Sequence, residues 1–337
     1  MKSTSYLENR CELVSILDSS CQLEIPLSNL ADTVIRIPKD SNFSMVRLSE
    51  YPQVLALEYP HSWFMKSALG RIATYVEVLG KTRIPTLKES PNAAGYDLKL
   101  ADVADFFNVC ANEHIALSQE EKDLKGRLIV QGLLTPIENG LLTYLQPTYQ
   151  ASSAHVLIAV DPWLNPFDRK VSYIHEYSHA LYFLDEEFRS RISRTFTSLA
   201  PEMKRFLHGL MIASGYYESG ESWLIETETQ AHAVEPQGGG HGFGNLIAAA
   251  EKNCDVHSNR SSDLACKDFH SYPDELREGL ITYLRDHYVK ASQDKIPFLT
   301  SLEKLENEQK ELEEHRKILK EILNKVGSSP RSHGLIP

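Results

Sequence analysis

Two histidines and a glutamate in the stretch His175-Glu176-Tyr177-Ser178-His179 have a spacing that is typical of a metal site. On a helix, residues four apart lie on one face, one turn apart, so both imidazoles can reach the same ion. Glu176 is turned about 100° away from His175, which lets its carboxylate address a water molecule without becoming a ligand. The pattern predicts Zn²⁺ bound by His175 and His179, with Glu176 as the general base of a hydrolase.

A catalytic zinc site needs a third protein ligand and one open position. The best candidate segment is Trp223–Glu235, in which Glu228 is followed by Ala231 and His232. Because Ala231 is small and lies one turn after Glu228, it lets two helices approach closely enough for the carboxylate to reach the metal. His232 is then placed to hydrogen-bond a ligand and fix its orientation. Glu226, two residues before Glu228, is an alternative third ligand.

The HExxH motif followed by a helix with Glu-x-x-Ala resembles the gluzincin branch of the zincin metallopeptidases. The resemblance covers roughly residues 155–245. It implies that His175, His179 and Glu228 are the zinc ligands and that Glu176 takes a proton from the attacking water and passes it to the leaving amine. The sequence differs from the family pattern at His232, where an aspartate is common. The implied activity is cleavage of a peptide bond.

Two more expectations follow from this resemblance. In zincins a strand that precedes the HExxH helix binds extended substrate at its edge, and His155–Val160 occupies that place in the sequence. An internal core strand is the alternative for this segment. A tyrosine or histidine often stabilises the oxyanion in such sites, and the candidates are Tyr217, its neighbour Tyr216, and His241. A structural role is the alternative for each of these three.

The chain is acidic, with a net charge of −11 from 35 lysines and arginines against 46 aspartates and glutamates. An acidic surface repels phosphate backbones, so neither nucleic acid nor an anionic membrane is an expected partner, and no basic patch is evident in the sequence. The expected partner is a protein or peptide substrate. No apolar run approaches the ~20 residues of a membrane-spanning helix, so we expect a soluble protein without a membrane span.

The N-terminal residues and the cysteines bear on the cellular compartment. The first thirty residues contain no apolar core of a cleavable signal peptide, which predicts a cytoplasmic protein or one exported without such a signal. The five cysteines are widely spaced and form no CxxC pair, which favours reduced thiols over a disulfide framework. Pairing of Cys254 with Cys266 is the alternative.

The elements that must position these side chains are short strands and amphipathic helices. Apolar runs bounded by turn residues predict strands, and apolar residues at helical spacing predict helices. The predicted strands are Thr33–Ile37, Met45–Leu48, Leu128–Leu134, Leu141–Leu145 and Val156–Val160. The predicted helices cover about 62–80, 100–117, 168–188, 203–214, 221–235, 274–288 and 297–326. The glycine-rich residues 237–244 are expected to form a loop, and residues 250–268 an irregular segment.

These elements predict an α+β fold in which a small mixed β-sheet and the HExxH helix form a zincin-like catalytic domain. An α/β region over residues 1–100 precedes this domain, which covers residues 101–290. A long charged helix over residues 291–326 and a disordered tail over residues 327–337 follow it. Polar residues at Gln309 and Arg316 in the heptad seam of that helix favour a packing helix over a dimeric coiled coil, and the oligomeric state stays open.

Three other functions are compatible with parts of the pattern. A di-iron protein would combine Glu176 and His179 with a second Glu-x-x-His pair, but the other such pair, Glu58 and His61, contains Pro60, which disfavours a helix. A zinc hydrolase that acts on a non-peptide bond would use the same metal site. A non-catalytic interaction module would instead use the charged C-terminal helix as its contact surface.

Overall fold

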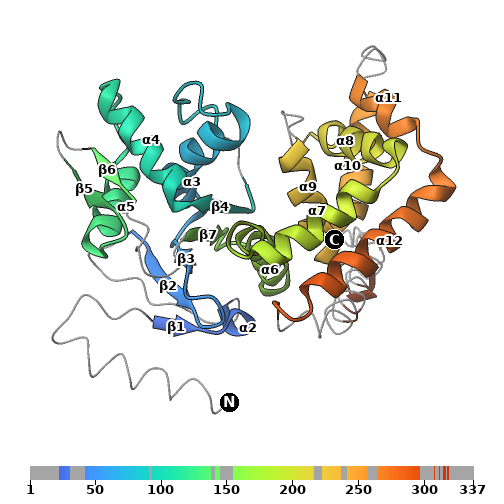
Figure 1. Cartoon of the computed structure of the whole chain (residues 1–337), viewed down its shortest axis with the longest axis horizontal. Coiled ribbons are helices and arrows are strands. Elements are labelled where there is room, and N and C mark those ends of the chain that lie inside the picture. The colour runs from blue at the N-terminus through green and yellow to red at the C-terminus, as the bar shows by residue number, and fades with distance from the viewer. Residues whose placement is uncertain are drawn as a thin grey trace, which may run out of the picture.

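The computed structural model describes residues 23–30, 42–90, 93–137, 141–144, 155–215, 222–236, 241–256 and 264–296, together with six single positions between 307 and 318. Over these residues the fold is α+β, with a mixed β-sheet and many helices (Figure 1). The predicted strand Thr33–Ile37 and the tail 327–337 lie outside the described residues. The predicted C-terminal helix also lies outside them, except for the six single positions, which are all helical.

The first half of the chain contains all the described strands together with several helices. Every described element of the second half is a helix. The first half contains β1 (Leu23–Ile25), α2 (Leu27–Leu30), β2 (Ser44–Leu48), β3 (Val54–Glu58), α3 (Ser62–Ala73), the π-helix η1 (Thr74–Val78), β4 (Gly95–Lys99), α4 (Leu100–Asn112), α5 (Gln119–Val130), β5 (Thr135–Pro136), β6 (Leu142–Thr143) and β7 (Val156–Val160). The second half contains α6 (Pro166–Leu184), α7 (Glu186–Ser198), α8 (Pro201–Ala213), α9 (Ser222–Val234), α10 (Gly242–Val256), α11 (Leu264–His270) and α12 (Asp274–Ser292). None of these described helices combines the length and the apolar character that crossing a lipid bilayer requires.

A mixed sheet with the strand order β1-β2-β3-β7-β4 divides the hydrophobic core in two. Strand β7 runs parallel to β3 on one side and antiparallel to β4 on the other. Both β3 and β7 are buried along their whole length, and successive side chains of a strand point to opposite faces. In β7, Val156, Ile158 and Val160 therefore belong to one core, and Leu157 and Ala159 belong to the other.

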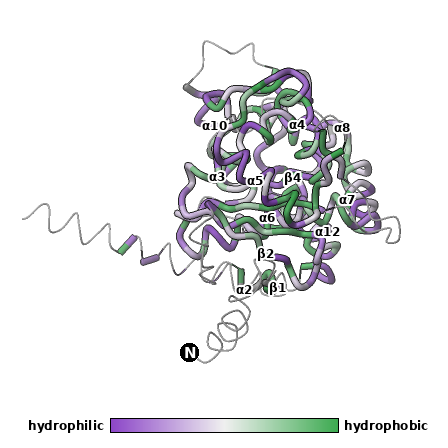
Figure 2. The backbone as a smooth tube through the Cα atoms, turned by 90° about the vertical axis from the view of Figure 1, so that its left-hand side faces the viewer, coloured by the Kyte–Doolittle hydropathy of each residue, from purple (hydrophilic) through white to green (hydrophobic). Residues whose placement is uncertain are grey.

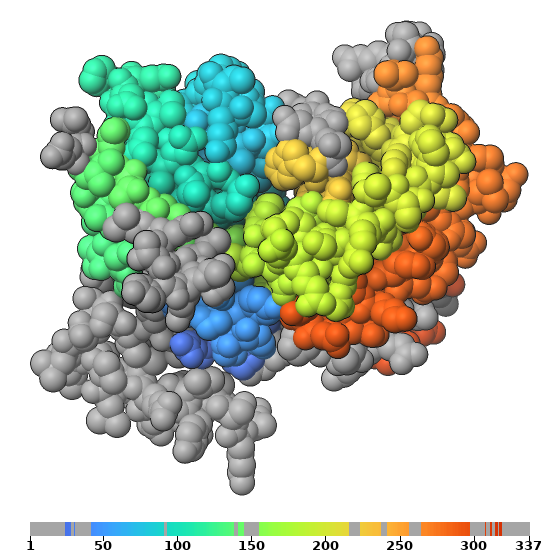
Figure 3. Space-filling model, viewed as in Figure 1, coloured from blue at the N-terminus to red at the C-terminus, as the bar shows by residue number. Residues whose placement is uncertain are grey.

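Different helices cover the two faces of this sheet. Helix α6 packs on β7 and β4, and the core that it buries continues into α7 to α12. Helices α3, α4 and α5 bury the other core. Figure 1 shows α6 running through the middle of the molecule between these two groups of helices, and Figure 2 shows hydrophobic residues along α6 and the neighbouring strands. Figure 3 shows that the two halves of the chain fill opposite sides of the molecule.

Helix α6, which carries the HExxH motif, has a defined start and a defined end. Asn165 caps its N-terminus by accepting a hydrogen bond from the N–H of Asp168, and Pro166 occupies the first helical position. At the other end, Asp185 leaves the helical conformation and caps α7 by accepting a hydrogen bond from the N–H of Phe188. The predicted single helix is therefore two helices joined by one residue.

The predicted strand Leu128–Leu134 is wrong, because its first residues complete α5. A capping box begins this helix: the Ser118 side chain accepts a hydrogen bond from the N–H of Glu121, and the Glu121 carboxylate accepts one from the N–H of Ser118. Leu124 and Leu128 lie one turn apart on α5 and are both fully buried. A short apolar run of this kind has no periodicity that distinguishes a buried helix end from a buried strand.

Two segments that were expected to lack regular structure are helical where they are described. Helix α10 begins at Gly242, inside the glycine-rich segment 237–244, while residues 237–240 lie outside the described part. The predicted irregular segment 250–268 contains the second half of α10 and the first residues of α11. Polar composition misled the prediction here, because only a narrow side of each helix is buried, as at Ala250 and Ala265.

A disulfide bond joins Cys254 on α10 to Cys266 on α11. The expectation of reduced thiols is therefore wrong for this pair, whereas Cys110 on α4 is a buried free thiol. The two bonded cysteines are 12 residues apart in the sequence. Nothing in that spacing reveals that the chain forms two helices that pack against each other and bring the thiols together.

Candidate metal centre

His175 and His179 lie one turn apart on α6, and Glu228 reaches them from α9. The Nε2 atoms of the two histidines are 3.1 Å apart. Oε2 of Glu228 is 3.3 Å from Nε2 of His175, and Oε1 of Glu228 is 3.6 Å from Nε2 of His179. A zinc ion with tetrahedral bonds of about 2.0–2.2 Å would hold its ligand atoms about 3.3–3.6 Å apart. The three predicted ligands therefore converge with the separations that a zinc ion needs.

The packing of α9 against α6 brings the carboxylate to the histidines. Ala231 lies one turn after Glu228 and is fully buried, as expected for a small residue between two closely packed helices. His179 and Glu228 are buried, and His175 is half-buried. The three side chains thus meet at the junction of two helices with little access to bulk water.

Glu235 orients His175, and the sequence prediction missed it. Its Oε1 atom is 2.5 Å from Nδ1 of His175, and its Oε2 atom accepts a hydrogen bond of 2.6 Å from the N–H of Gly242 at the start of α10. Because Nδ1 of His175 donates to this carboxylate, Nε2 is the nitrogen that faces the other ligands. Glu235 follows α9 seven residues after Glu228, which places it on the same face of the helix, and that spacing is the signal that could have identified it.

His232, for which the sequence predicted the orienting role, lies beside both carboxylates. Its Nδ1 atom is 3.4 Å from Oε2 of Glu235, and its Nε2 atom is 3.9 Å from Oε2 of Glu228. Its ring packs edge-on against the ring of His175, with centroids 4.8 Å apart. His232 therefore packs on the ligand and contacts the carboxylate that orients it.

His175, His232 and Glu235 form a second group whose atoms are close enough to hold a metal. This group shares His175 with the first one. The 2.5 Å separation between Glu235 and Nδ1 of His175 is a hydrogen-bond distance, and it leaves no room for an ion between the two atoms. The second group is best understood as the hydrogen-bonded support of the first.

Glu176 faces the strand β4. A side-chain carbon at position 95 would collide with the carboxylate of Glu176, so Gly95 lets the strand pass close to this residue. Asp97 lies two residues further along β4, on the same face, and its side chain forms a hydrogen bond with Glu176. A hydrogen bond between two carboxyl groups requires a proton on one of them. The sequence prediction identified neither Gly95 nor Asp97, because both come from a strand that it did not predict.

The carboxyl groups on the β4 side of the site hold their protons more tightly than usual. Burial raises the pKa of Glu176 well above its usual value, and the nearby carboxylates of Asp97 and Glu228 raise it further. Burial also raises the pKa of Asp97. Burial together with the charge of Asp97 raises the pKa of Glu77, which lies on η1. These groups crowd several negative charges into a small volume, a setting that favours a cation.

Among the proposed ligands, close contacts between carboxylates and histidines lower the pKa of the glutamate and raise the pKa of a histidine. Burial disfavours the charged form of Glu228, but His179 and His175 outweigh it and hold the pKa of Glu228 well below its usual value. Burial likewise disfavours the charged form of His175, but hydrogen bonds to Glu228 and Glu235 outweigh it and raise the pKa of His175 well above its usual value. The carboxylates that stabilise a proton on His175 are equally suited to stabilise a divalent cation at Nε2.

The structure directs Glu226, the alternative ligand, away from the two histidines. Its Oε1 atom accepts a hydrogen bond of 2.7 Å from the hydroxyl of Tyr182 and another from the hydroxyl of Ser193. These partners belong to α6 and α7, so Glu226 links three helices. The geometry therefore favours Glu228 over Glu226 as the third ligand.

Of the candidates for stabilising the oxyanion, the structure describes His241 alone, and this residue lies away from the proposed ligands. Nε2 of His241 is 2.9 Å from Oδ1 of Asp168, and its ring packs against Phe167, in the first turn of α6. His175 lies about two turns further along that helix, so His241 is not brought together with the ligands. Tyr217 and its neighbour Tyr216 lie outside the described residues.

The expectation that His155–Val160 offers an edge for substrate is wrong. The strand in this segment, β7, pairs with β3 and with β4, so it is internal to the sheet. β4 ends the described sheet on this side, and it is also the strand that passes Glu176. An extended chain that adds to the sheet beside the metal centre would therefore pair with β4.

The second Glu-x-x-His pair in the sequence does not form a metal site in this fold. Glu58 is the last residue of β3, and its carboxylate accepts hydrogen bonds from Arg169 and Tyr173 of α6. His61 precedes α3 and packs against the exposed ring of Trp163. The di-iron alternative is therefore not supported, because it requires both residues on one helix face.

Comparisons with protein-family models, with curated proteins and with solved structures give no match to this chain. The chemistry of the site must therefore be argued from its own geometry. Two imidazoles and one carboxylate converge from two helices, and a further carboxyl group, that of Glu176, lies between them and β4. Such a set can bind a divalent cation and accept a proton next to it.

Proposed function

We propose that this chain is a zinc-dependent hydrolase, and more specifically a metallopeptidase with a zincin-like catalytic domain. The observation that carries the proposal is the triangle of 3.1, 3.3 and 3.6 Å between the coordinating atoms of His175, His179 and Glu228. Two nitrogens and one carboxylate oxygen are a ligand set of catalytic zinc, which keeps a fourth position open, whereas structural zinc sites usually close with four protein ligands.

A zinc ion held by these residues would supply Lewis acidity, which polarises a carbonyl group and makes a water molecule easier to deprotonate. Glu176 acts as the base that takes the proton from water and delivers it to the leaving group. Asp97 keeps the Glu176 side chain in place through their hydrogen bond.

A peptide is the substrate class that best fits the surroundings of Glu176. Strand β4 lies at the end of the described sheet, and an extended peptide can form backbone hydrogen bonds with a strand in that position. The same strand contacts the carboxylate of Glu176 at Gly95. A peptide added to β4 would therefore run past the base, which supports peptide-bond hydrolysis over hydrolysis of other bonds.

The deciding experiment is the substitution Glu176→Gln. The variant should retain one zinc ion per chain by elemental analysis and lose about 10²-fold or more of its activity against a peptide library read by mass spectrometry. Glu226→Gln is the matched control, because it makes the same chemical change on α9 and should leave zinc content and cleavage intact. Wild-type turnover in the Glu176→Gln variant would contradict the assignment.

The two remaining alternatives predict different results for the wild-type chain. A hydrolase of a non-peptide bond would retain zinc and cleave no member of the peptide library. A non-catalytic module need not retain near-stoichiometric metal that a chelator removes. The contact surface expected for such a module, the helix 297–326, lies almost wholly outside the described residues.

A further inference from the structure

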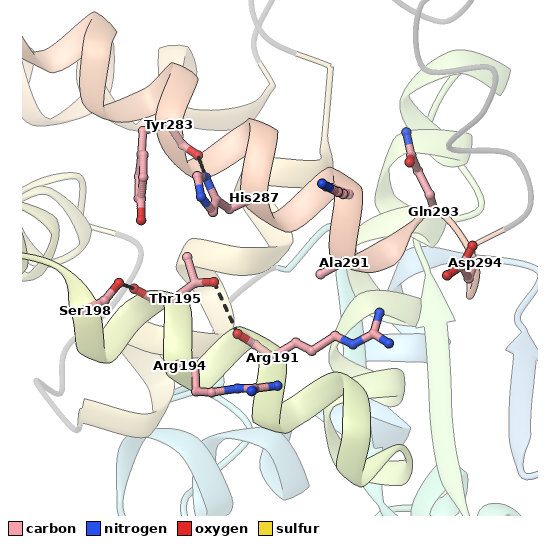
Figure 4. A pocket seen from close by; sticks show the side chains of 10 residues that line it. Arg191, Arg194, Thr195, Ser198, Tyr283, His287, Ala291, Gln293 and Asp294 are labelled. Carbon is pink, nitrogen blue, oxygen red and sulfur yellow. Dashed lines mark hydrogen bonds between the residues drawn. The ribbon is translucent and has the colours of Figure 1, made fainter.

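A groove between α7 and α12 gathers basic and hydroxyl side chains from both helices (Figure 4). Its volume is about 680 Å³, within the range of pockets that hold small molecules. None of the residues that line it belongs to the metal centre. The groove is therefore a separate feature, and the proposed hydrolysis makes no use of it.

Each wall of the groove presents two basic side chains. Arg191 and Arg194 lie three residues apart on α7, and His287 and Lys290 lie three residues apart on α12. Residues at this spacing share one face of their helix, and all four line the groove. Asp294 is the only acidic residue among those that line the groove.

The cationic side chains of the groove are only partly compensated by acidic residues. Within the described part of the chain, neither Arg194 nor Lys290 forms an ion pair, and both are exposed. Arg191 pairs with Glu187 at the surface, but the Glu187 side chain is 64% exposed, and exposed pairs of this kind exchange readily with other anions. This concentration of positive charge is unusual on a chain with a net charge of −11.

Hydroxyl groups from both helices face the same space. Thr195 and Ser198 lie on α7, where their hydroxyls donate to helix carbonyls and can rotate toward a bound anion. Tyr283 on α12 lines the same groove and is 39% exposed. His287 is held by a 2.8 Å hydrogen bond between its Nδ1 and the carbonyl oxygen of Tyr283.

We propose that this groove binds a small molecule that carries several phosphate groups. Guanidinium groups bind phosphate with two parallel hydrogen bonds, and a lysine adds a point charge. A phosphate group accepts more hydrogen bonds than a carboxylate, which matches a groove that supplies both basic and hydroxyl donors. An acidic peptide spreads its charges along an extended chain, whereas the donors here lie along one groove between two helices. The negative net charge of the protein opposes the approach of such an anion, so its binding has to rest on the donors of this groove.

The test is a calorimetric titration of the full chain with inositol hexakisphosphate at about 0.15 M salt, where weak surface attraction is screened. We expect saturable binding of one molecule per chain. Because hydrogen bonds to charged groups contribute about 1.5–3 kcal/mol, Arg194→Glu should weaken binding about tenfold or more, and Lys290→Glu on the opposite wall should do the same.

The matched control is Arg205→Glu on α8. Arg205 is exposed and lies outside the groove, so this variant makes the same change in net charge at a different place. It should bind inositol hexakisphosphate as the unaltered chain does. Three outcomes would overturn the proposal: no saturable binding, an equal loss of affinity in Arg205→Glu and Arg194→Glu, or equally tight binding of a polyglutamate peptide.

Discussion

The chemistry of the metal centre depends on which atom each side chain turns toward its neighbours. His175 offers Nε2 to the site because Nδ1 is bonded to Glu235, and Glu235 is itself held by the backbone N–H of Gly242. Glu176 is held in the same way from the other side, by Asp97 on β4. The proposed ligands and the proposed base are thus positioned by neighbouring residues that are not themselves proposed ligands, and substituting those residues tests the arrangement.

Replacing Glu235 with glutamine should weaken zinc binding about 10- to 100-fold, the usual effect of losing the carboxylate that orients a ligating histidine. The variant keeps the size of the side chain but loses the charge that raises the basicity of His175. The measurement is competition for zinc with a chelator of known affinity. Glu226→Gln serves as the control, and an unchanged zinc affinity in Glu235→Gln would show that His175 needs no such support.

Replacing Gly95 with alanine should reduce peptide cleavage while zinc stays bound. The added methyl group would meet the carboxylate of Glu176, so either that side chain or the strand β4 has to move. A displaced base loses part of the 10²–10⁴-fold contribution that is typical of proton transfer by a positioned group. We therefore expect kcat to fall by up to about tenfold. Gly126→Ala on α5, where an added carbon meets nothing, is the control. Full activity in Gly95→Ala would mean that Glu176 does not act from its present position.

At the scale of secondary-structure elements, the sequence predicted which three side chains come together and missed the residues that support them. His175 and His179 share one helix, and Glu228 precedes a small residue on another, so the spacing within single helices revealed all three. Glu235 lies just beyond the end of α9, and Asp97 lies on a strand that was not predicted. The role of Asp97 depends on how elements pack against one another, which periodicity does not show, whereas the seven-residue spacing from Glu228 could have pointed to Glu235.

The difference between periodicity within one element and packing between elements also explains the errors in the predicted fold. Strand β7 was predicted correctly as an apolar run, but only the pairing with β3 and β4 shows that it is internal. The end of α5 was predicted to be a strand, because a run of apolar residues can be buried in either structure. The link between α10 and α11 was missed because two cysteines in a polar segment give no sign of the helices that bring them together.

The disulfide between α10 and α11 should contribute measurably to stability. Closing a loop of this length removes conformational entropy from the unfolded chain worth about 3 kcal/mol. Changing Cys254 and Cys266 together to serine should lower the free energy of unfolding by about that amount in urea denaturation. Cys110→Ser keeps the disulfide and is the control for the loss of a thiol. If a reducing agent leaves the unfolding midpoint of the unaltered chain unchanged, the two cysteines are not bonded in solution.

At the scale of the whole molecule, the candidate site lies where the two halves of the chain meet. Residues of β4 and η1 come from the first half, and α6 and α9 come from the second. Helix α6 contacts the sheet on one side and α9 on the other, so it fixes the base and the ligands relative to both cores. The negative charges that crowd this junction are costly unless a cation or protons compensate them.

Zinc should therefore stabilise the fold of the whole chain as well as support catalysis. A ligand that binds the folded state alone adds about 2.7 kcal/mol to the free energy of unfolding when its concentration is a hundred times its Kd. We expect the thermal midpoint to fall when a chelator removes zinc and to recover when zinc is restored. Glu228→Gln removes one ligand and should abolish this difference, whereas Glu176→Gln leaves all three ligands and should keep it. Since the ligands come from α6 and α9, a midpoint that does not respond to zinc in the unaltered chain would mean that no ion joins these two helices.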